Sequence, residues 1–346
     1  MNGWFLGQPH TGSGQYTTHL LRELRGVDVR AAHPPSNAAS NLGKLRWEQL
    51  GWPAVARNEE ADLLHCPYFA LPLKRNRPAV VTIHDVIPLL LPAYRGNPLV
   101  RAYSALQALA CRSAEAILVD SECSRRDVIR LLKASAERVH VVYLAVDGRF
   151  TPDRGGPSPL DRPYIFYIGG WDVRKNVPAL IRAFEALSAS RPELVLAIAG
   201  RPGGTGPMFP DLQALAAPLG DRVRFLGRVS DEQKVDLYRH AEVFVFPSLY
   251  EGFGLDPLEA LACGCPVVCS DASSLPEIVG EAGILVDARV DQALSAAICQ
   301  ALDDSERLRE AGPRQAARFD WVRTAEQTRQ VYAQALGDRG AEPRLS

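Results

Sequence analysis

The feature that most constrains this chain is a regular alternation of short apolar runs with longer helix-forming stretches. Runs at residues 78–83, 164–168 and 243–247 have the length and the β-branched or aromatic content of buried strands. Because strands that alternate with helices assemble into parallel sheets, the pattern predicts an α/β fold with doubly wound parallel sheets. At 346 residues the chain is too long for one ordinary core, so we expect two such domains.

A segment rich in proline, glycine and aspartate at residues 150–163 marks the expected boundary between the domains. We therefore expect an N-terminal domain at residues 1–155 and a C-terminal domain at residues 156–321. A helix is predicted at residues 322–336, and a polar tail at residues 337–346. The N-terminal domain begins without a full first strand, because the apolar run at residues 4–6 is short.

The composition is that of a globular protein, with 47% hydrophobic and 23% charged residues. The seven cysteines are an odd number without a Cys-x-x-Cys pair, which argues against a disulfide framework or a zinc site. Cys263, Cys265 and Cys269 surround an apolar strand, so we expect buried thiols. The N-terminus lacks the pattern of a signal peptide and no apolar run reaches the length of a membrane span, so we expect a cytoplasmic protein.

Charge is unevenly distributed, with a basic excess in residues 1–155 and an acidic excess in the remainder. A basic half would suit an anionic acceptor or a membrane surface. A chance imbalance over solvated faces explains so modest an excess equally well.

A glycine-rich turn links the run at residues 243–247 to a helix predicted at residues 258–262. Such a turn presents backbone N–H groups at a helix N-terminus, where the helix dipole favours an anion such as a phosphate. Glu251 stands at the start of the turn and Glu259 about two helical turns further on, so one ligand can contact both carboxylates. The alternative is a plain strand-to-helix turn with two solvated glutamates, which Gly-x-Gly alone would favour.

A second turn of this kind follows the strand predicted at residues 164–168. It contains Gly169 and Gly170, and then Arg174 and Lys175 before a helix predicted at residues 177–188. Glycines admit close approach to a ligand and the two cations supply charge-assisted donors, so the turn predicts a diphosphate site. A solvated basic pair is the alternative.

Two features of the N-terminal half point to the same kind of site. Gly12 and Gly14 open a helical stretch, where a glycine loop can approach a phosphate or a sugar, although a simple turn explains them equally well. His84 ends the strand at residues 78–83, where α/β folds carry ligand groups. The adjacent Asp85 strengthens that interpretation over a purely structural histidine.

Two serines have the spacing of a capping box at the start of a helix. Ser124 is followed three residues later by Asp127, and Ser230 is followed by Gln233. The second pair predicts a helix at residues 231–240. The chain after residue 286 is expected to form two helical stretches, one at residues 290–303 and the other over residues 324–336 of the last helix.

Residues 251–260 resemble the Glu-x7-Glu signature of retaining, nucleotide-sugar-dependent glycosyltransferases of family four, which have the GT-B fold. The resemblance covers residues 12–336 and is strongest at residues 164–286. It implies two Rossmann-like domains that face an interdomain cleft, with the last helix crossing back to the N-terminal domain. Asp256 departs from the pattern, since proline is usual there, and Gly170 stands where an arginine often follows the first glycine.

The resemblance also implies roles for the residues of the predicted site. The departing nucleoside diphosphate would be stabilised by Lys175, Arg174 and the amides of the turn, without a metal ion or any other cofactor. Glu251 would hold sugar hydroxyls, Glu259 would hold the ribose, and His84 would contact the donor sugar. The expected catalytic residues are His84, Glu251 and Lys175. The expected donor-binding residues are Gly12, Gly14, Gly170, Arg174, Lys175, Gly252, Phe253, Gly254, Leu255 and Glu259.

The form Gly-Gly-x-Asp-x-Arg-Lys-Asn resembles mannosyltransferases of bacterial polysaccharide synthesis, which favours GDP-mannose as donor and a glycan or lipid-linked hydroxyl as acceptor. UDP-glucose and related UDP-sugars stay open as donors. Three other functions stay open: a nucleotide-sugar epimerase, an enzyme like glycogen phosphorylase, and a catalytically silent nucleotide-sugar-binding subunit. We expect no nucleic-acid partner, a monomer or homodimer, and peripheral contact with the inner membrane face as an option.

Overall fold

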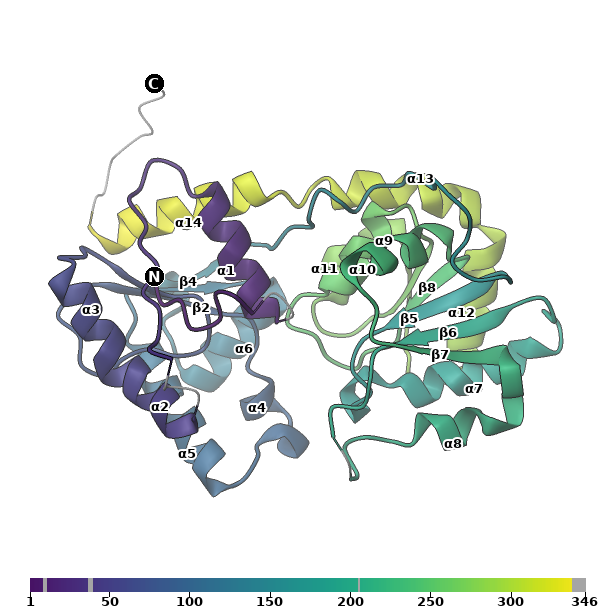
Figure 1. Cartoon of the computed structure of the whole chain (residues 1–346), viewed down its shortest axis with the longest axis horizontal. Coiled ribbons are helices and arrows are strands. Elements are labelled where there is room, and N and C mark those ends of the chain that lie inside the picture. The colour runs from purple at the N-terminus through teal and green to yellow at the C-terminus, as the bar shows by residue number, and fades with distance from the viewer. Residues whose placement is uncertain (9–10, 37–39, 205, 338–346) are drawn as a thin grey trace. The chain divides into compact units, whose positions relative to one another are not determined.

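The structure is a computed structural model that describes residues 1–8, 11–36, 40–204 and 206–337 (Figure 1). The chain forms two compact units: Met1–Leu144 with the segment from Asp320 onward, and Ala145–Phe319. Residues 145–155, expected in the first domain, thus belong to the second unit. Within that unit the Phe150 ring packs against Tyr238, with 6.2 Å between ring centroids, and Arg149 pairs with Asp231. Residues 338–346 of the predicted tail lie outside the described residues.

The N-terminal unit contains a four-stranded parallel sheet in the order β1-β2-β3-β4. Its strands are β1 (Leu64–Cys66), β2 (Ala79–Ile83), β3 (Ala116–Val119) and β4 (Val139–Val141). Every residue of β1, β2 and β3 is buried, as expected for a parallel sheet covered on both faces. The apolar run at residues 4–6 forms a turn, and Asn2 makes a single parallel bridge with Ala32.

Helices cover this sheet, and the last helix of the chain is one of them. The helix α14 lies beside α1 in Figure 1, where α14 is yellow and α1 is purple. Tyr16 and Leu20 of α1 share one apolar cluster with Val331 and Tyr332 of α14. The helical elements of this unit are α1 (Gly12–Glu23), α2 (Asn41–Arg46), η1 (Trp47–Gly51), α3 (Trp52–Asn58), α4 (Ile87–Leu90), η2 (Pro92–Tyr94), α5 (Pro98–Arg112), α6 (Glu122–Leu132), η3 (Ala136–Arg138) and α14 (Trp321–Ala335).

The C-terminal unit contains a six-stranded parallel sheet in the order β10-β9-β8-β5-β6-β7. Its strands are β5 (Tyr164–Ile168), β6 (Val195–Ala199), β7 (Val223–Gly227), β8 (Val243–Phe246), β9 (Val267–Ser270) and β10 (Ile284–Val286). The first strand, β5, pairs with both β6 and β8, so the chain builds outward from it in two directions. The predicted fold class, two parallel-sheet α/β domains, is confirmed.

The helical elements of the C-terminal unit are η4 (Val173–Lys175), α7 (Val177–Ser188), α8 (Leu212–Ala216), η5 (Ala217–Arg222), α9 (Asp231–His240), α10 (Leu255–Ala262), α11 (Leu275–Val279), η6 (Gly280–Ala282), α12 (Asp291–Asp303) and α13 (Ser305–Ala316). The predicted bounds of α7 and α9 match the structure. Helix α13 was not expected, because its sequence is polar and contains Gly312 and Pro313. Gly312 lets α13 approach α10 closely, since a Cβ there would lie 2.8 Å from the Leu261 carbonyl oxygen.

One of the two predicted capping boxes is present. The Ser230 hydroxyl accepts from the Gln233 N–H at 3.2 Å, and the Gln233 side chain accepts from the Ser230 N–H at 2.8 Å. The prediction for Ser124 is wrong, because Ser124 lies inside α6. The cap of α6 is Ser121, whose hydroxyl accepts from the Ser124 N–H at 3.0 Å. Ser121 has extended backbone angles and so stands just outside the helix, as a capping residue must.

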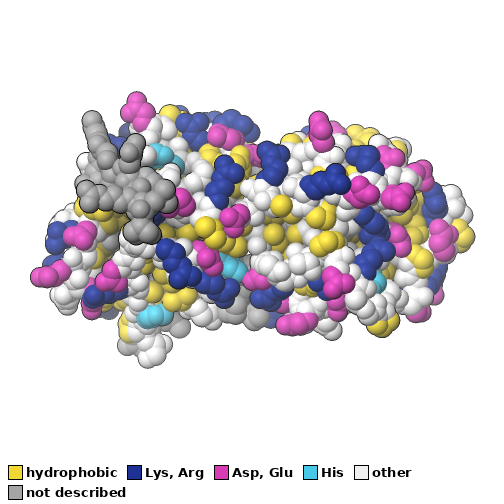
Figure 2. Space-filling view, turned by 90° about the horizontal axis from the view of Figure 1, so that it is seen from above, with side chains coloured by type: hydrophobic (Ala, Val, Ile, Leu, Met, Phe, Trp, Pro, Cys, Tyr) yellow, Lys and Arg dark blue, Asp and Glu magenta, His cyan; other side chains and the backbone are white. Residues whose placement is uncertain are grey.

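The described residues contain no helix that is long and apolar enough to cross a membrane. On the face drawn in Figure 2, Lys and Arg side chains are interspersed with Asp and Glu side chains. Cys263, Cys265 and Cys269 are buried free thiols, as predicted.

Candidate functional site

Two turns of the C-terminal unit meet at the carboxyl ends of the neighbouring strands β5 and β8. The strand order reverses between these strands, and open α/β sheets bind ligands at such a point. The turn after β5 leads into η4, and the turn after β8 leads into α10. A backbone hydrogen bond joins them, because the Leu249 N–H donates to the Arg174 carbonyl oxygen at 2.8 Å. The fold therefore brings together the two turns that the sequence singles out separately.

Three predicted residues form one ion-pair cluster at this junction. Lys175 Nζ lies 2.7 Å from Glu251 Oε1, and Arg174 Nη1 lies 2.8 Å from the same oxygen. Arg174 also donates to the carbonyl oxygen of Tyr250 at 2.7 Å and lies 3.6 Å from Asp172. Two cations and a glutamate that the sequence analysis assigned to separate tasks thus lie in contact within one unit.

The cluster is largely shielded from water, which strengthens its electrostatic interactions. The side chains of Arg174, Lys175 and Glu251 are only 11–13% exposed. Lys175 Nζ also lies 4.6 Å from the centroid of the Phe246 ring, where the electron-rich face attracts a cation. Two cations share a single carboxylate oxygen, so an arriving anion can take over donors that are already aimed at one point.

The backbone of the turn after β8 is held in place by two serines. Ser274 donates from its hydroxyl to the carbonyl oxygens of Glu251 and Phe253, at 3.1 and 2.6 Å. The Ser273 hydroxyl accepts from the Glu251 N–H at 2.8 Å. Gly254 has φ +115°, and a Cβ there would lie 2.9 Å from Leu275. These contacts fix the turn so that α10 begins at Leu255 with its first N–H groups directed out of the helix.

The predicted Gly170 and Phe253 have structural contacts of their own. The Tyr167 hydroxyl donates to the Gly170 carbonyl oxygen at 2.6 Å, which anchors the turn after β5. Phe253 is buried and packs edge-on against Phe319, with 5.9 Å between ring centroids. Both residues support the backbone of the site.

Glu259 lies on α10, buried beside two charged residues whose contacts with it were not predicted. Lys234 Nζ of α9 forms an ion pair with Glu259 and lies 3.0 Å from Asp256 Oδ1. The Tyr238 hydroxyl donates to Glu259 Oε2 at 3.4 Å. Burial raises the pKa of the Glu259 carboxyl, and the Lys234 ammonium opposes that increase. Lys234 was missed because it lies in a polar helix that looks solvent-exposed in sequence.

In the N-terminal unit, His84 follows β2 and contacts a carboxylate that follows the neighbouring strand β3. His84 Nδ1 lies 2.7 Å from Asp120 Oδ2, and Nε2 lies 3.2 Å from the Pro67 carbonyl oxygen. Both partners are acceptors, so the geometry favours an imidazolium that donates from both nitrogens. Burial lowers the pKa of His84, but the Asp120 carboxylate outweighs burial and the net shift is upward.

Asp85 does not hydrogen-bond to the imidazole, although it adjoins His84 in sequence. Its Oδ1 accepts from the Ile87 N–H at 2.9 Å, so it stabilises the start of α4. Asp120 was missed because it is adjacent to His84 only across the sheet.

The two predicted N-terminal glycines differ in their surroundings. Both lie in the first turn of α1, after the capping residue Thr11. The Gly14 N–H donates to the Thr11 hydroxyl at 3.1 Å, and a Cβ on Gly14 would lie 2.2 Å from the Gln8 carbonyl oxygen. Gly14 is therefore required by close backbone packing, whereas a Cβ on Gly12 would meet nothing within 4 Å.

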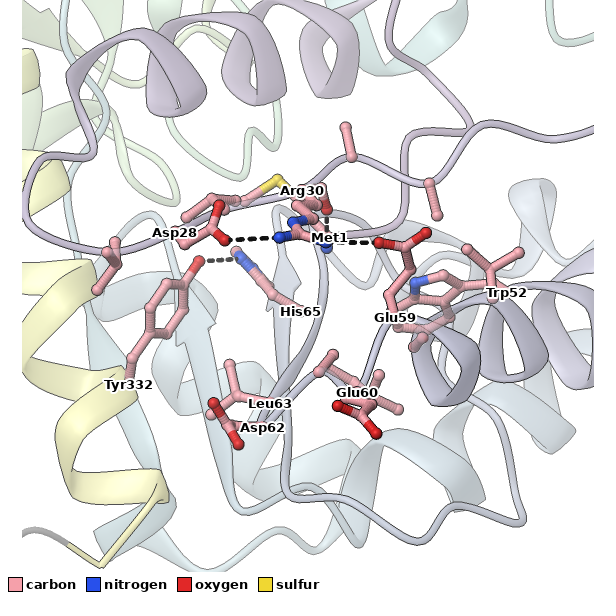
Figure 3. A pocket seen from close by; sticks show the side chains of 18 of the residues that line it. Met1, Asp28, Arg30, Trp52, Glu59, Glu60, Asp62, Leu63, His65 and Tyr332 are labelled. Carbon is pink, nitrogen blue, oxygen red and sulfur yellow. Dashed lines mark hydrogen bonds and ion pairs between the residues drawn. The ribbon is translucent and has the colours of Figure 1, made fainter.

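A pocket of about 550 Å³ lies elsewhere in the N-terminal unit (Figure 3). Arg30 spans part of it, paired with Asp28 and Glu59. His65 forms another part of the lining and bonds through Nδ1 to the Tyr332 hydroxyl at 2.6 Å. None of the predicted site residues lines this pocket. Across the described ranges of the chain, no group of three or more His, Cys, Asp or Glu side chains is placed to hold a metal ion.

Two family models match consecutive parts of the chain. The one described as Glycosyl transferases group 1 matches residues 151–318, and the one described as Glycosyltransferase Family 4 matches residues 13–150. Together they cover residues 13–318. The predicted Glu251–Glu259 motif and the Arg174–Lys175 pair lie within the first match.

Curated relatives align over nearly the whole chain. The O-antigen chain mannosyltransferase B of Escherichia coli is 36% identical, and the alignment covers 94% of this chain and 96% of that protein. The D-inositol 3-phosphate glycosyltransferase of Mycolicibacterium smegmatis is 32% identical, with 90% and 75% covered.

Solved structures share the architecture at lower identity. WaaG, a glycosyltransferase involved in lipopolysaccharide biosynthesis, superposes with a TM-score of 0.69 at 18% identity, covering 92% of this chain and 95% of that one. Anabaena HepE, in complex with UDP-glucose, gives a TM-score of 0.68 at 22% identity, covering 93% and 89%.

Proposed function

The chain belongs to the group 1 glycosyl transferases, and from this membership we propose that it transfers mannose from GDP-mannose to an acceptor hydroxyl with retention of configuration. The fold is GT-B and the protein is a glycosyltransferase. The proposed acceptor is a glycan or a lipid-linked sugar. The donor and acceptor rest on resemblance to bacterial mannosyltransferases, among them the O-antigen chain enzyme.

The observation that carries the proposal is the cluster of Arg174, Lys175 and Glu251 at the switch point of the C-terminal sheet. Breaking the bond between the anomeric carbon and the diphosphate oxygen leaves negative charge on the diphosphate. Two shielded cations and the first amides of α10 supply preorganised donors for that charge. These donors meet the electrostatic need without a divalent ion, so we propose a metal-independent reaction.

Glu251 has a second task in this proposal. When the diphosphate takes over the donors of Arg174 and Lys175, the carboxylate becomes available to accept hydrogen bonds from sugar hydroxyls. The acceptor oxygen then forms its bond to the anomeric carbon on the same face, and its proton passes to the departing phosphate oxygen. No protein nucleophile is required in this proposal.

His84 is the proposed contribution of the N-terminal unit. As an imidazolium held by Asp120 it would stabilise charge and orient hydroxyls of the donor sugar. Gly12 and Gly14 are proposed to allow the donor to approach the start of α1. Glu259 is proposed to hold the ribose.

A UDP-sugar is the second candidate donor, because HepE, which shares the fold, was solved with UDP-glucose. A panel of GDP-mannose, GDP, UDP-glucose and UDP, each with EDTA, tests both by the rise in melting temperature. A ligand that binds only the native state at 100 times its Kd adds about 2.7 kcal/mol of stability. We expect the guanosine ligands to shift the transition. A shift by uridine ligands alone would replace the donor, and no shift by any of the four would contradict the proposal.

A further inference from the structure

Three charged side chains from two helices meet inside the C-terminal unit. Lys234 lies on α9, and Asp256 and Glu259 lie three residues apart on α10, on one face of that helix. Lys234 Nζ contacts both carboxylates, at 3.0 Å for Asp256. The side chain of Lys234 is 17% exposed and that of Glu259 only 6%. A buried carboxylate is costly unless it is paired, so the two acids depend on this one ammonium.

The positions of Asp256 and Glu259 on α10 stabilise their carboxylates to different degrees. Asp256 lies in the first turn of α10, where the positive end of the helix dipole favours a carboxylate. Glu259 lies one turn further and gains little from the dipole. It is also the more deeply buried of the two. Lys234 is therefore more important for Glu259 than for Asp256.

The two oxygens of Glu259 are not equivalent. Oε2 contacts Lys234 Nζ and accepts from the Tyr238 hydroxyl at 3.4 Å. Oε1 has no hydrogen-bond partner in the described part of the chain, and it is not sealed from solvent. The carboxylate is thus fixed by one oxygen and can accept from a ligand with the other.

We propose that Lys234 is a positioning residue for the donor nucleotide, which fixes Glu259 through Oε2 so that Oε1 accepts from a ribose hydroxyl. The inference rests on the proposed function, because it takes Glu259 as the ribose contact. Asp256 acts on the same carboxylate, since it shares the Lys234 ammonium with Glu259 and its negative charge lies close to that of Glu259.

The arrangement predicts how donor affinity depends on pH. Burial raises the pKa of Glu259, so donor binding weakens as pH falls through that pKa. The titratable groups near Glu259 are Lys234 and Tyr238 of α9, Asp256 in the first turn of α10, and Cys263 just after the end of α10. We call the loss of donor affinity at low pH the acid limb of the pH profile. Removing the ammonium leaves Glu259 beside the negative charge of Asp256 without a cation between them, which moves the acid limb to higher pH. Removing the charge of Asp256 moves it to lower pH.

The test measures KM for the donor and kcat between pH 5.5 and 9 in the full chain. We expect Lys234→Met to raise KM about tenfold near pH 7, which corresponds to a pKa shift of about one unit. The value of kcat should change far less, and raising the pH should restore part of the affinity. Lys234→Arg should recover most of the loss.

Two further variants keep the test decisive. Asp256→Asn should shift the acid limb in the opposite direction, and it decides the question if Lys234→Met does not fold. Asp236→Asn removes an exposed charge from the same helix and should leave the profile unchanged. If wild type binds no nucleotide, the proposed function fails. If wild type turns over donor but KM and the acid limb stay constant in the Lys234 and Asp256 variants, this inference is overturned.

Discussion

The two units build their candidate residues in the same way but hold them differently. In each, charged side chains come from the ends of two adjacent parallel strands, β5 and β8 in one unit and β2 and β3 in the other. In the C-terminal unit two cations share one carboxylate oxygen, which the oxygen of a bound anion can displace. In the N-terminal unit one imidazole is clamped between two acceptors, and Asp120 is only 3% exposed. The first arrangement suits ligand exchange and the second suits a fixed charge.

The largest expected effect comes from breaking the exchangeable cluster. Lys175→Ala should lower the rate of sugar transfer by about 10²–10³, the usual cost of removing one donor that stabilises developing charge. The measurement is the initial rate with saturating donor. Arg289→Ala, which removes an exposed cation from the same unit, should retain wild-type activity. A Lys175→Ala enzyme with unchanged turnover would end the assignment of this cluster.

A smaller effect should follow from removing the carboxylate that holds the His84 imidazolium. Asp120→Asn removes the carboxylate that raises the pKa of His84, so the imidazolium is lost at lower pH. If the charged imidazole is needed, activity falls as pH rises through the His84 pKa, and the variant should show that decline earlier. A displacement of one pH unit corresponds to about a tenfold lower activity on the alkaline side. An alkaline limb that does not move would mean that His84 acts as a neutral group.

The same substitution should also change how the free energy of unfolding depends on pH. Because the folded-state pKa of His84 is raised, its contribution is fully present below the unfolded value of about 6.5. It is lost as pH rises through the folded pKa. The stability difference between wild type and Asp120→Asn should therefore shrink above that pKa, as measured by denaturant unfolding at several pH values.

The smallest expected effect lies away from both clusters. Tyr332→Phe removes the hydroxyl that contacts buried His65, which should cost about 1–3 kcal/mol of stability for an unsatisfied buried group. Nucleotide binding by the C-terminal unit should not change, so the thermal shift caused by the donor should match that of wild type. A loss of nucleotide binding in this variant would show that the two units are not independent in the way the comparison assumes.

Sequence reasoning predicted the parts of the fold that local patterns determine. The α/β alternation, the bounds of α7 and α9, and the Ser230 cap follow from apolar periodicity and capping chemistry. Helix α13 was missed because Gly312 and Pro313 have low helix propensity. Gly312 is present because α13 packs closely against α10 at that position. Local propensity misleads where close helix packing determines the residue.

The candidate site was predictable in its motifs but not in its partners. Glycine turns with flanking charges identify Lys175 and Glu251, because those residues are adjacent to the turns in sequence. Asp120 and Lys234 are separated from their partners by whole elements, so only the sheet register and the helix packing bring them together. Adjacency pointed to Asp85 instead, which in the structure bonds to the backbone of its own loop.

The chain enters the second unit at Ala145 and leaves it at Phe319, and α14 then packs in the first unit. The C-terminal unit is therefore an insertion within the sequence of the N-terminal one. During synthesis from the N-terminus, every strand of the inserted unit leaves the ribosome before α14 does. The inserted unit can thus complete its core first, while Tyr16 and Leu20 of α1 are not yet packed against α14. A truncation that removes α14 would leave the apolar side chains of α1 without the partners that α14 provides.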